Sequence, residues 1–270
     1  MARDPFRGVR FDEDRFLKAM SRRAAGKRYV ICFTPRSGSS RLTDILTHTG
    51  TLGTPGEFFN PAFIPDIAQT FSARNLTDYV DLVLRLRNTD GIFGCEITYP
   101  QIFGSFGGFM ESLQPTATLS LIREDIVAQA VSISRMVQTK VSHSTASSCE
   151  EIAGADDRFS YAPRQIERYL CALAWMEHRT HDYLSGCGAC PLRLTYERTI
   201  AMAPSRLVRM IATHVGVGDD LPGADSAHHK LGQEKSMDFA TRFRRERPQL
   251  IRTIDRNRHH ILQAHRQQQD

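Results

Sequence analysis

The stretch YVICFTPRSGSSRLTDIL, residues 29–46, decides the fold, because an apolar run leads into a loop of small and polar residues and then into an amphipathic pattern. This order predicts a strand, a tight loop and the N-terminus of a helix. Such a junction directs unpaired backbone N–H groups and the positive end of the helix dipole at one point, which favours a phosphate or sulfate. We therefore expect an anion-binding loop at residues 34–40. A plain turn with a serine cap is the structural alternative.

The residues of this loop differ from the nucleoside-triphosphatase pattern, in which Lys and then Ser or Thr follow the last glycine. Here Gly38 is followed by Ser39 and Ser40 and preceded by Arg36 and Ser37. The planar guanidinium of arginine offers five donors to an oxyanion, and the serine hydroxyls add more. The loop therefore favours an anionic donor bound without a metal over ATP with magnesium.

Apolar segments and helical patterns alternate along the rest of the chain. The expected strands are 29–33, 91–97, 117–122 and 191–195, and the expected helices are 39–49, 75–88, 125–140, 162–184 and 204–215. The alternation predicts an α/β fold, a P-loop-like three-layer arrangement with a central, mostly parallel sheet flanked by helices. Asn75 is expected to cap helix 75–88, and the segments 141–160 and 216–236 are expected to be long loops.

Length and charge bound the class of protein. At 270 residues with 41% hydrophobic residues, the chain suits a single domain over residues 1–270, with 1–26 as an N-terminal helical extension and 237–270 as a basic C-terminal helical segment. The net charge of +5 is too small to predict nucleic-acid binding and suits anionic ligands or an anionic surface. With neither a membrane-spanning apolar run nor the apolar core of a signal peptide, we expect the cytoplasm.

The cysteines and the tail arginines are expected to be mainly structural. Three cysteines lie in apolar segments and are expected in the core: Cys32, Cys95 and Cys171. Cys187 and Cys190, with His178 and His181 upstream, offer four possible zinc ligands, but the spacing is unusual and free loop thiols are preferred, so no metal site is predicted. The arginines between 242 and 258 are expected to be mostly a solvated helix face, with one or two as candidates for contacting an anion.

A second candidate anion site follows the expected strand 117–122. Arg123 stands at the end of this strand, and Ser132 lies two to three turns into the next helix. Because parallel strands end at one edge of the sheet, Arg123 is expected near the loop at 34–40. Ser132 adds a hydroxyl to the same anion if its helix face turns inward, and is otherwise a packed polar residue.

Jointly these motifs resemble sulfotransferases, in which a loop of the type Pro-Arg/Lys-Ser-Gly-Ser/Thr follows the first strand and an arginine and a serine belong to a later strand–helix unit. Segments 53–59, 129–132 and 137–139 are similar to the bacterial trehalose and glycolipid sulfotransferases, a family that includes enzymes sulfating lipopolysaccharide sugars. The likeness spans about residues 29–140 and continues more weakly through Tyr196 and 235–245. It implies 3′-phosphoadenosine 5′-phosphosulfate as the donor, no metal, and a sugar or glycolipid as the acceptor.

The resemblance also implies roles for single residues. The 5′-phosphosulfate would be held by the loop residues Arg36, Ser37, Gly38, Ser39 and Ser40, and the 3′-phosphate by Arg123 and Ser132. Glu57 matches the carboxylate that serves as general base in the family, and the resemblance implies that role for it. Two positions depart from the pattern: Thr54 stands where the trehalose enzyme carries a carboxylate, and Glu96 stands where a lysine is expected. Trehalose itself is therefore not predicted as the acceptor.

The implied reaction is an in-line transfer of a sulfuryl group to a hydroxyl, in which Glu57 takes the proton and Arg36 with the loop amides neutralises developing charge. His48 is the reserve base, and Trp175 is a candidate for stacking on a sugar or for the core. A magnesium-dependent, kinase-like phosphotransferase with Asp125 on the metal is one alternative. A non-catalytic module that binds anionic glycolipids is another. Further candidate partners are an anionic membrane surface, through peripheral contact, and a second copy of the chain in a homodimer.

Overall fold

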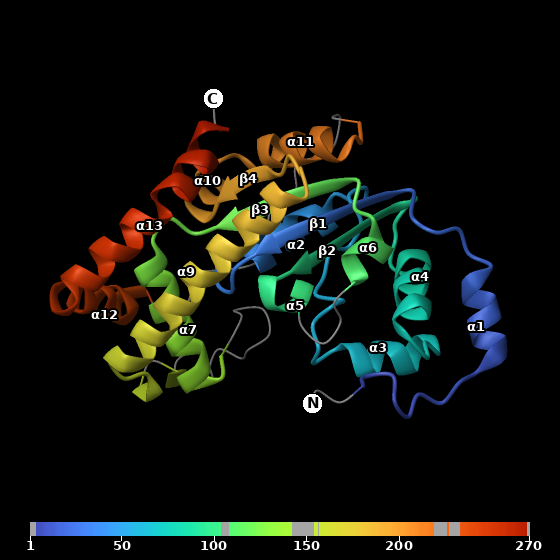
Figure 1. Ribbon diagram of the computed structural model, residues 1–270, viewed down its shortest axis with the longest axis horizontal. Helices are drawn as coiled ribbons and strands as arrows, with labels where there is room; N and C mark the ends of the chain where they lie inside the picture. The colour runs from blue at the N-terminus through green and yellow to red at the C-terminus, as the bar shows by residue number, and fades with distance from the viewer. Residues whose placement is uncertain are drawn as a thin grey trace.

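The computed structural model describes residues 4–103, 108–141, 154–155, 157–218, 226 and 233–268. These residues form one sheet in the order β2-β1-β3-β4, with all neighbouring strands parallel. The strands are β1 (Lys27–Phe33), β2 (Ile92–Ile97), β3 (Ala117–Ile122) and β4 (Leu192–Thr195). They match the four expected strands to within two residues, and helices cover both faces of the sheet (Figure 1). The predicted α/β class with a parallel central sheet is confirmed.

The five expected helices are present, and the structure adds several short ones. The expected helices are α2 (Ser39–His48), α4 (Leu76–Leu86), α7 (Ile126–Thr139), α9 (Pro163–Gly186) and α11 (Pro204–Val215). Outside the two ends of the chain, the additions are α3 (Ile64–Phe71), α5 (Tyr99–Phe103), α6 (Phe109–Leu113) and α10 (Tyr196–Ala201). Asn75 caps α4 as predicted, since its side chain accepts a hydrogen bond of 2.9 Å from the Asp78 amide.

The two ends of the chain are helical and pack against the rest. Near the N-terminus, α1 (Glu13–Met20) contacts α3 and α4, and the Phe6 ring lies 5.9 Å from that of Tyr79. The tail forms α12 (Gln233–Glu246) and α13 (Pro248–Gln267), which pack on α7 and on α9 with β4. The expectation that 216–236 is entirely loop is wrong at its end, because α12 begins at Gln233. Most of 141–160 and of 216–236 lies outside the described residues.

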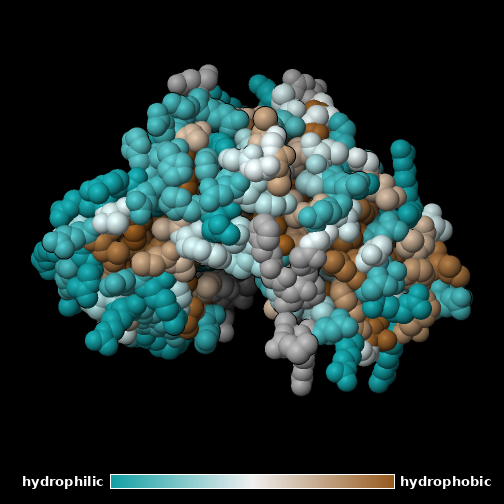
Figure 2. Space-filling view, in the orientation of Figure 1, coloured by the Kyte–Doolittle hydropathy of each residue, from teal (hydrophilic) through white to brown (hydrophobic). Residues whose placement is uncertain are grey.

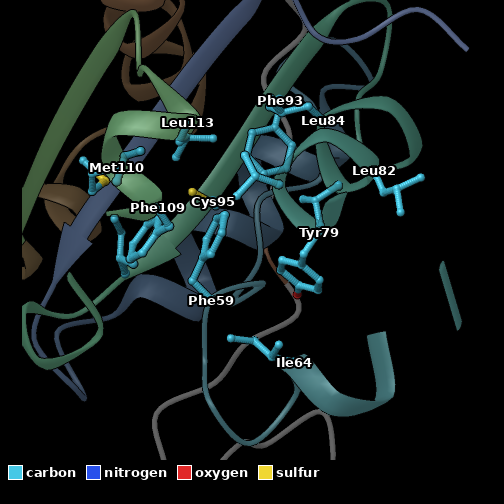
Figure 3. Packing of buried hydrophobic residues seen from close by; sticks show 14 of the residues in the cluster. Phe59, Ile64, Tyr79, Leu82, Leu84, Phe93, Cys95, Phe109, Met110 and Leu113 are labelled. Atoms are coloured by element: carbon cyan, nitrogen blue, oxygen red, sulfur yellow. The ribbon is translucent and has the colours of Figure 1, made fainter. Parts of the chain in front are cut away.

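One face of the sheet carries the packing that fixes a segment important for the site. The Phe59 and Phe109 rings are stacked, with centroids 4.2 Å apart, and the edge of Tyr79 approaches Phe59, as Figure 3 shows. The Tyr79 hydroxyl also donates a hydrogen bond to the Phe58 carbonyl. Because Phe59 is fully buried, this aromatic cluster anchors the backbone directly after Glu57.

The surface separates polar and apolar regions. On the face shown in Figure 2, hydrophilic residues predominate at the left end, where Figure 1 places α12 and α13, and apolar side chains gather toward α1 and α4 at the right. In the described ranges, no helix combines the length and apolarity needed to cross a membrane. Cys32 and Cys95 are buried as predicted, but Cys171 is exposed because its side of α9 faces away from the core.

Candidate functional site

The loop between β1 and α2 has the predicted tight conformation. The Ser37 amide donates to the Thr34 carbonyl at 3.1 Å, and both Arg36 and Gly38 have left-handed backbone, with φ of 66° and 86°. A Cβ on Gly38 would lie 2.5 Å from the Tyr196 ring, so glycine is required by both space and conformation. A non-glycine residue such as Arg36 rarely adopts this conformation, and such residues are concentrated at functional sites.

The N-terminus of α2 is open to an anion. Gly38 is its N-cap, no side chain caps the helix, and no acidic residue lies in its first turn. The Ser37 hydroxyl is fully buried and has no hydrogen-bond partner among the described residues. Ser39 is buried and Ser40 half-buried. The amides and the dipole of α2 thus lie beside a buried hydroxyl that has no partner among the described residues.

Helix α7 holds the loop from the neighbouring strand–helix unit. The Arg36 Nε donates a hydrogen bond of 3.0 Å to the Ser132 hydroxyl. The buried Gln129 amide donates to the Thr34 hydroxyl at 2.9 Å and to the Pro35 carbonyl at 2.7 Å. The sequence left open whether Ser132 turns inward or is a packed polar residue, and in the structure its hydroxyl contacts Arg36. Sequence reasoning missed the structural role of Gln129, whose neighbours on α7 gave no local signal of a contact with the loop.

Positive charge is concentrated beside the loop. Burial, followed by the charges of Arg123 and Arg135, lowers the pKa of the Arg36 guanidinium. The Arg123 guanidinium lies over the Tyr196 ring at 4.8 Å, and its Nε is buried without a hydrogen-bond partner in the described part of the chain, 3.8 Å from a Glu197 carboxylate oxygen. A bound anion would stabilise this group of arginines.

A buried ion pair holds the β3–α7 turn, which carries Arg123. Arg258 of α13 and Glu177 of α9 are both fully buried, with nitrogen–oxygen distances of 2.6 and 3.0 Å. The same guanidinium donates to the carbonyls of Arg123 at 2.7 Å and Glu124 at 3.2 Å. Arg258 is thus an exception to the solvated tail face, and its role is to fix the β3–α7 turn.

Other tail arginines pair with carboxylates, including one near this turn. Arg244 lies 2.5 Å from Asp125, whose side chain also accepts from the Ala128 amide as the N-cap of α7. Asp125 is therefore committed to a cap and an ion pair, which disfavours the magnesium-holding role of the kinase alternative.

Glu57 returns to the edge of the sheet. Gly56 forms a parallel bridge with Cys95, and its carbonyl accepts a hydrogen bond of 2.9 Å from the Glu96 amide. Glu57 is half-buried, and its carboxylate accepts a hydrogen bond of 2.7 Å from the Asn60 side chain. The segment that follows α2 thus runs beside β2 and carries Glu57 to the strand end that also holds Glu96.

The remaining candidates are His48, Thr54 and the cysteine pair Cys187 and Cys190. His48 is exposed at the far end of α2, about 14 Å along the helix from the loop by helix rise, and its ring contacts Asp44. This position disfavours His48 as the reserve base. Thr54 is exposed ahead of the bridge at Gly56. Cys187 and Cys190 are exposed, and no described cluster of His, Cys, Asp or Glu side chains is placed to hold a metal.

A buried tyrosine that contacts an exposed tryptophan follows β2. Tyr99 begins α5 directly beyond this strand, and the Trp175 ring of α9 lies edge-on to it with centroids 5.2 Å apart. The Arg179 Nε donates to the Tyr99 hydroxyl at 3.1 Å. Trp175 is 50% exposed, so the core alternative for this side chain is wrong. Its indole is available to a ligand near the carboxyl edge of the sheet.

Two of three comparisons with known proteins found a match. Among solved structures, a crystal structure of a sulfotransferase from Alicyclobacillus acidocaldarius is similar, with a TM-score of 0.47 and 18% sequence identity over 85% of this chain and 96% of that chain. No curated protein matched. The family model described as Stf0 sulphotransferase matches residues 28–93 and 92–246, which is well over half of the chain and includes the anion loop, Glu57 and the β3–α7 turn. The chain therefore belongs to the Stf0 sulphotransferase family.

Proposed function

We propose that this sulfotransferase moves the sulfuryl group of 3′-phosphoadenosine 5′-phosphosulfate to a hydroxyl of a carbohydrate or glycolipid. The observation that carries the donor assignment is the uncapped N-terminus of α2, with the neighbouring Arg36 and the buried Ser37 hydroxyl, which has no partner in the described part of the chain. These groups are donors suited to a sulfate or phosphate ester, and they need no metal to bind one.

The sulfuryl donor has two anionic ends, the 5′-phosphosulfate and the 3′-phosphate. The site has two groups of cationic or hydroxyl side chains that can donate hydrogen bonds to them. The 5′-phosphosulfate is assigned to the loop residues Arg36, Ser37, Gly38, Ser39 and Ser40, and the 3′-phosphate to Arg123 and Ser132. The buried Nε of Arg123, which has no hydrogen-bond partner among the described residues, supports the second assignment. The bond between Arg36 and Ser132 couples the two halves of the site.

The proposed mechanism is an in-line displacement in which Glu57 is the general base. Glu57 takes the proton of the acceptor hydroxyl while the acceptor oxygen bonds to sulfur. The bond between sulfur and the bridging phosphate oxygen breaks, and 3′-phosphoadenosine 5′-phosphate leaves. Arg36 and the loop amides stabilise the charge that develops on the sulfuryl and bridging oxygens. A positioned carboxylate base contributes roughly 10²–10⁴ in rate.

The exposed tryptophan supports a carbohydrate as the acceptor. The flat apolar face of a sugar ring packs well on an indole, and Trp175 offers one near the strand end that carries the carboxylates. We further propose that residues 1–270 act as one domain, since both chain ends pack on the central elements. We also propose that the exposed arginines of α12 and α13 contact an anionic membrane surface, and that the protein forms a homodimer.

The experiment that tests the donor assignment is calorimetric titration with 3′-phosphoadenosine 5′-phosphate, ADP and ATP, each with and without magnesium. We expect tight, magnesium-independent binding that requires the 3′-phosphate and is weakened at least about tenfold in Arg36→Ala, because a charged hydrogen bond is lost. A preference for magnesium-ATP would support the kinase alternative. Salt-sensitive liposome binding without nucleotide binding or turnover would support the glycolipid-binding module.

A further inference from the structure

Glu96 is a buried carboxyl at the donor loop that the mechanism above does not use. The bridge between Gly56 and Cys95 puts Glu96 in register with Glu57, and residues paired across parallel strands point to the same face. Glu96 is only 5% exposed, and it is hydrogen-bonded to Ser39, the first residue of α2. The two carboxyls and the anion loop therefore share one corner of the sheet edge.

The two carboxyl oxygens of Glu96 differ in their hydrogen bonding. Ser39 is the hydrogen-bond partner of the side chain, while Oε1 is buried and has no partner among the described residues. Buried polar atoms in folded proteins are nearly always hydrogen-bonded, so this carboxyl oxygen beside the β1–α2 loop is available to bind a ligand. A protonated oxygen at this position is a donor, and an ionised one is an acceptor that repels anions.

The surroundings of Glu96 favour its protonated form. Burial and, to a lesser extent, the negative charge of Glu57 raise its pKa to about 8, although the hydrogen bond with Ser39 acts to lower the pKa. The other titratable groups coupled to it in the described part of the chain are Tyr29 on β1 and Cys95 on β2, and neither is a cation. A buried carboxyl that has a second carboxyl beside it and no neighbouring cation is favoured in its protonated form.

We propose that Glu96 completes the donor site as a neutral carboxylic acid, with Oε1–H donating a hydrogen bond to the anion at the N-terminus of α2 and Glu57 beside it as the general base. This inference rests on the proposed donor. Ionisation of Glu96 places a negative charge against the phosphosulfate, so donor binding requires the proton. Affinity is therefore full below the pKa of Glu96 and falls by up to about tenfold per pH unit above it.

The test is calorimetric titration of the full chain with 3′-phosphoadenosine 5′-phosphate from about pH 6.5 to about pH 9.5. We expect the wild-type Kd to be level at neutral pH and to rise above about pH 8. Glu96→Gln, which is neutral and keeps a donor, is expected to bind within about threefold of wild type at neutral pH and to lose the alkaline weakening that is specific to Glu96. Glu57→Gln keeps that weakening but moves its midpoint to lower pH, because a neighbouring negative charge is removed.

Glu13→Gln, which changes an exposed glutamate of α1, is the matched control and keeps the wild-type profile. If the Kd of wild type and of Glu96→Gln depends on pH in the same way, the inference is overturned and the donor assignment stays intact. Loss of binding in a folded Glu96→Gln protein has the same meaning. Absence of any binding by wild type overturns the donor assignment and this inference with it.

A second measurement on wild type does not depend on a variant that folds. Carbon-13 NMR of the glutamate carboxyls should show one group that titrates near pH 8, and its midpoint should rise when 3′-phosphoadenosine 5′-phosphate binds. A midpoint that the ligand does not move overturns the inference.

Discussion

Replacing Arg258 with methionine should destabilise the protein more than any substitution of an exposed arginine on the same helix. The guanidinium is fully buried and makes hydrogen bonds of 2.6 and 3.0 Å to Glu177 and of 2.7 and 3.2 Å to the carbonyls of Arg123 and Glu124. Methionine fills much of the volume but leaves the Glu177 carboxylate buried without its cation. It also leaves the β3–α7 turn without two donors.

The expected cost follows from these contacts. Breaking a buried ion pair by removing one partner costs about 3–5 kcal/mol. At roughly 2–4 °C of Tm per kcal/mol for a domain of this size, the Tm should fall by about 6–20 °C. Burial raises the pKa of Glu177 and Arg258 lowers it, so without Arg258 the folded-state pKa rises further. When the pKa of a carboxyl is higher in the folded than in the unfolded state, the folded state becomes more stable as the pH falls. The difference in unfolding free energy between Arg258→Met and wild type should therefore shrink toward pH 5.

Circular dichroism melts and urea unfolding at about pH 8 and pH 5 measure both effects. Arg252→Met, at an exposed position on α13, is the matched control and should stay within about 0.5 kcal/mol of wild type. The double variant Arg258→Met with Glu177→Leu should recover part of the loss, because it leaves no uncompensated charge. A Tm for Arg258→Met within 2 °C of wild type by this scale, or a deficit that does not change with pH, would refute the reasoning.

Three further predictions concern the site. Gly38→Ala should lower stability by about 1–3 kcal/mol and weaken donor binding, as seen by melting and calorimetry, because its Cβ meets Tyr196 and its φ is positive. Glu57→Gln should keep donor binding at neutral pH yet lose roughly 10²–10⁴ in kcat, and unchanged turnover would remove Glu57 from the mechanism. Trp175→Ala should raise KM for a sugar acceptor several-fold in steady-state assays with no change in donor Kd, and an unchanged KM would exclude stacking.

The sequence predicted those parts of the fold that have a local signature. The β1–α2 junction was predictable because apolar residues, a Gly/Ser loop and a helical pattern follow one another within residues 29–46. Asn75 was predictable as a cap, since its side chain is bonded three residues along the chain. The placement of Arg123 near the loop needed only the rule that parallel strands end at the same edge.

Contacts between distant segments had no such signature. The bridge that brings Gly56 beside β2 is a single long-range pairing without periodicity, so the arrival of Glu57 at the sheet edge followed only from the family resemblance. Arg258 is one of many arginines in a polar tail, and only the packing of α13 against α9 distinguishes it. Cys171 shows the converse error, because apolar neighbours in the sequence do not determine which side of α9 faces the core.

The order of the strands indicates how the proposed donor is oriented in the site. The chain passes from β1 to β2 on one side and returns to β3 on the other, so the order reverses at β1, and ligands of open α/β sheets bind at such a point. The β3 side of the loop carries Arg123, whereas the β2 side carries Glu57 and Glu96. A 3′-phosphate on the β2 side would meet the negative charge of Glu57, while on the β3 side it meets a guanidinium. We infer that the 3′-phosphate points to β3 and the sulfuryl group to β2. The acceptor must then approach from the β2 side, where Trp175 is exposed, and this is the side on which a carboxylate base can reach its hydroxyl.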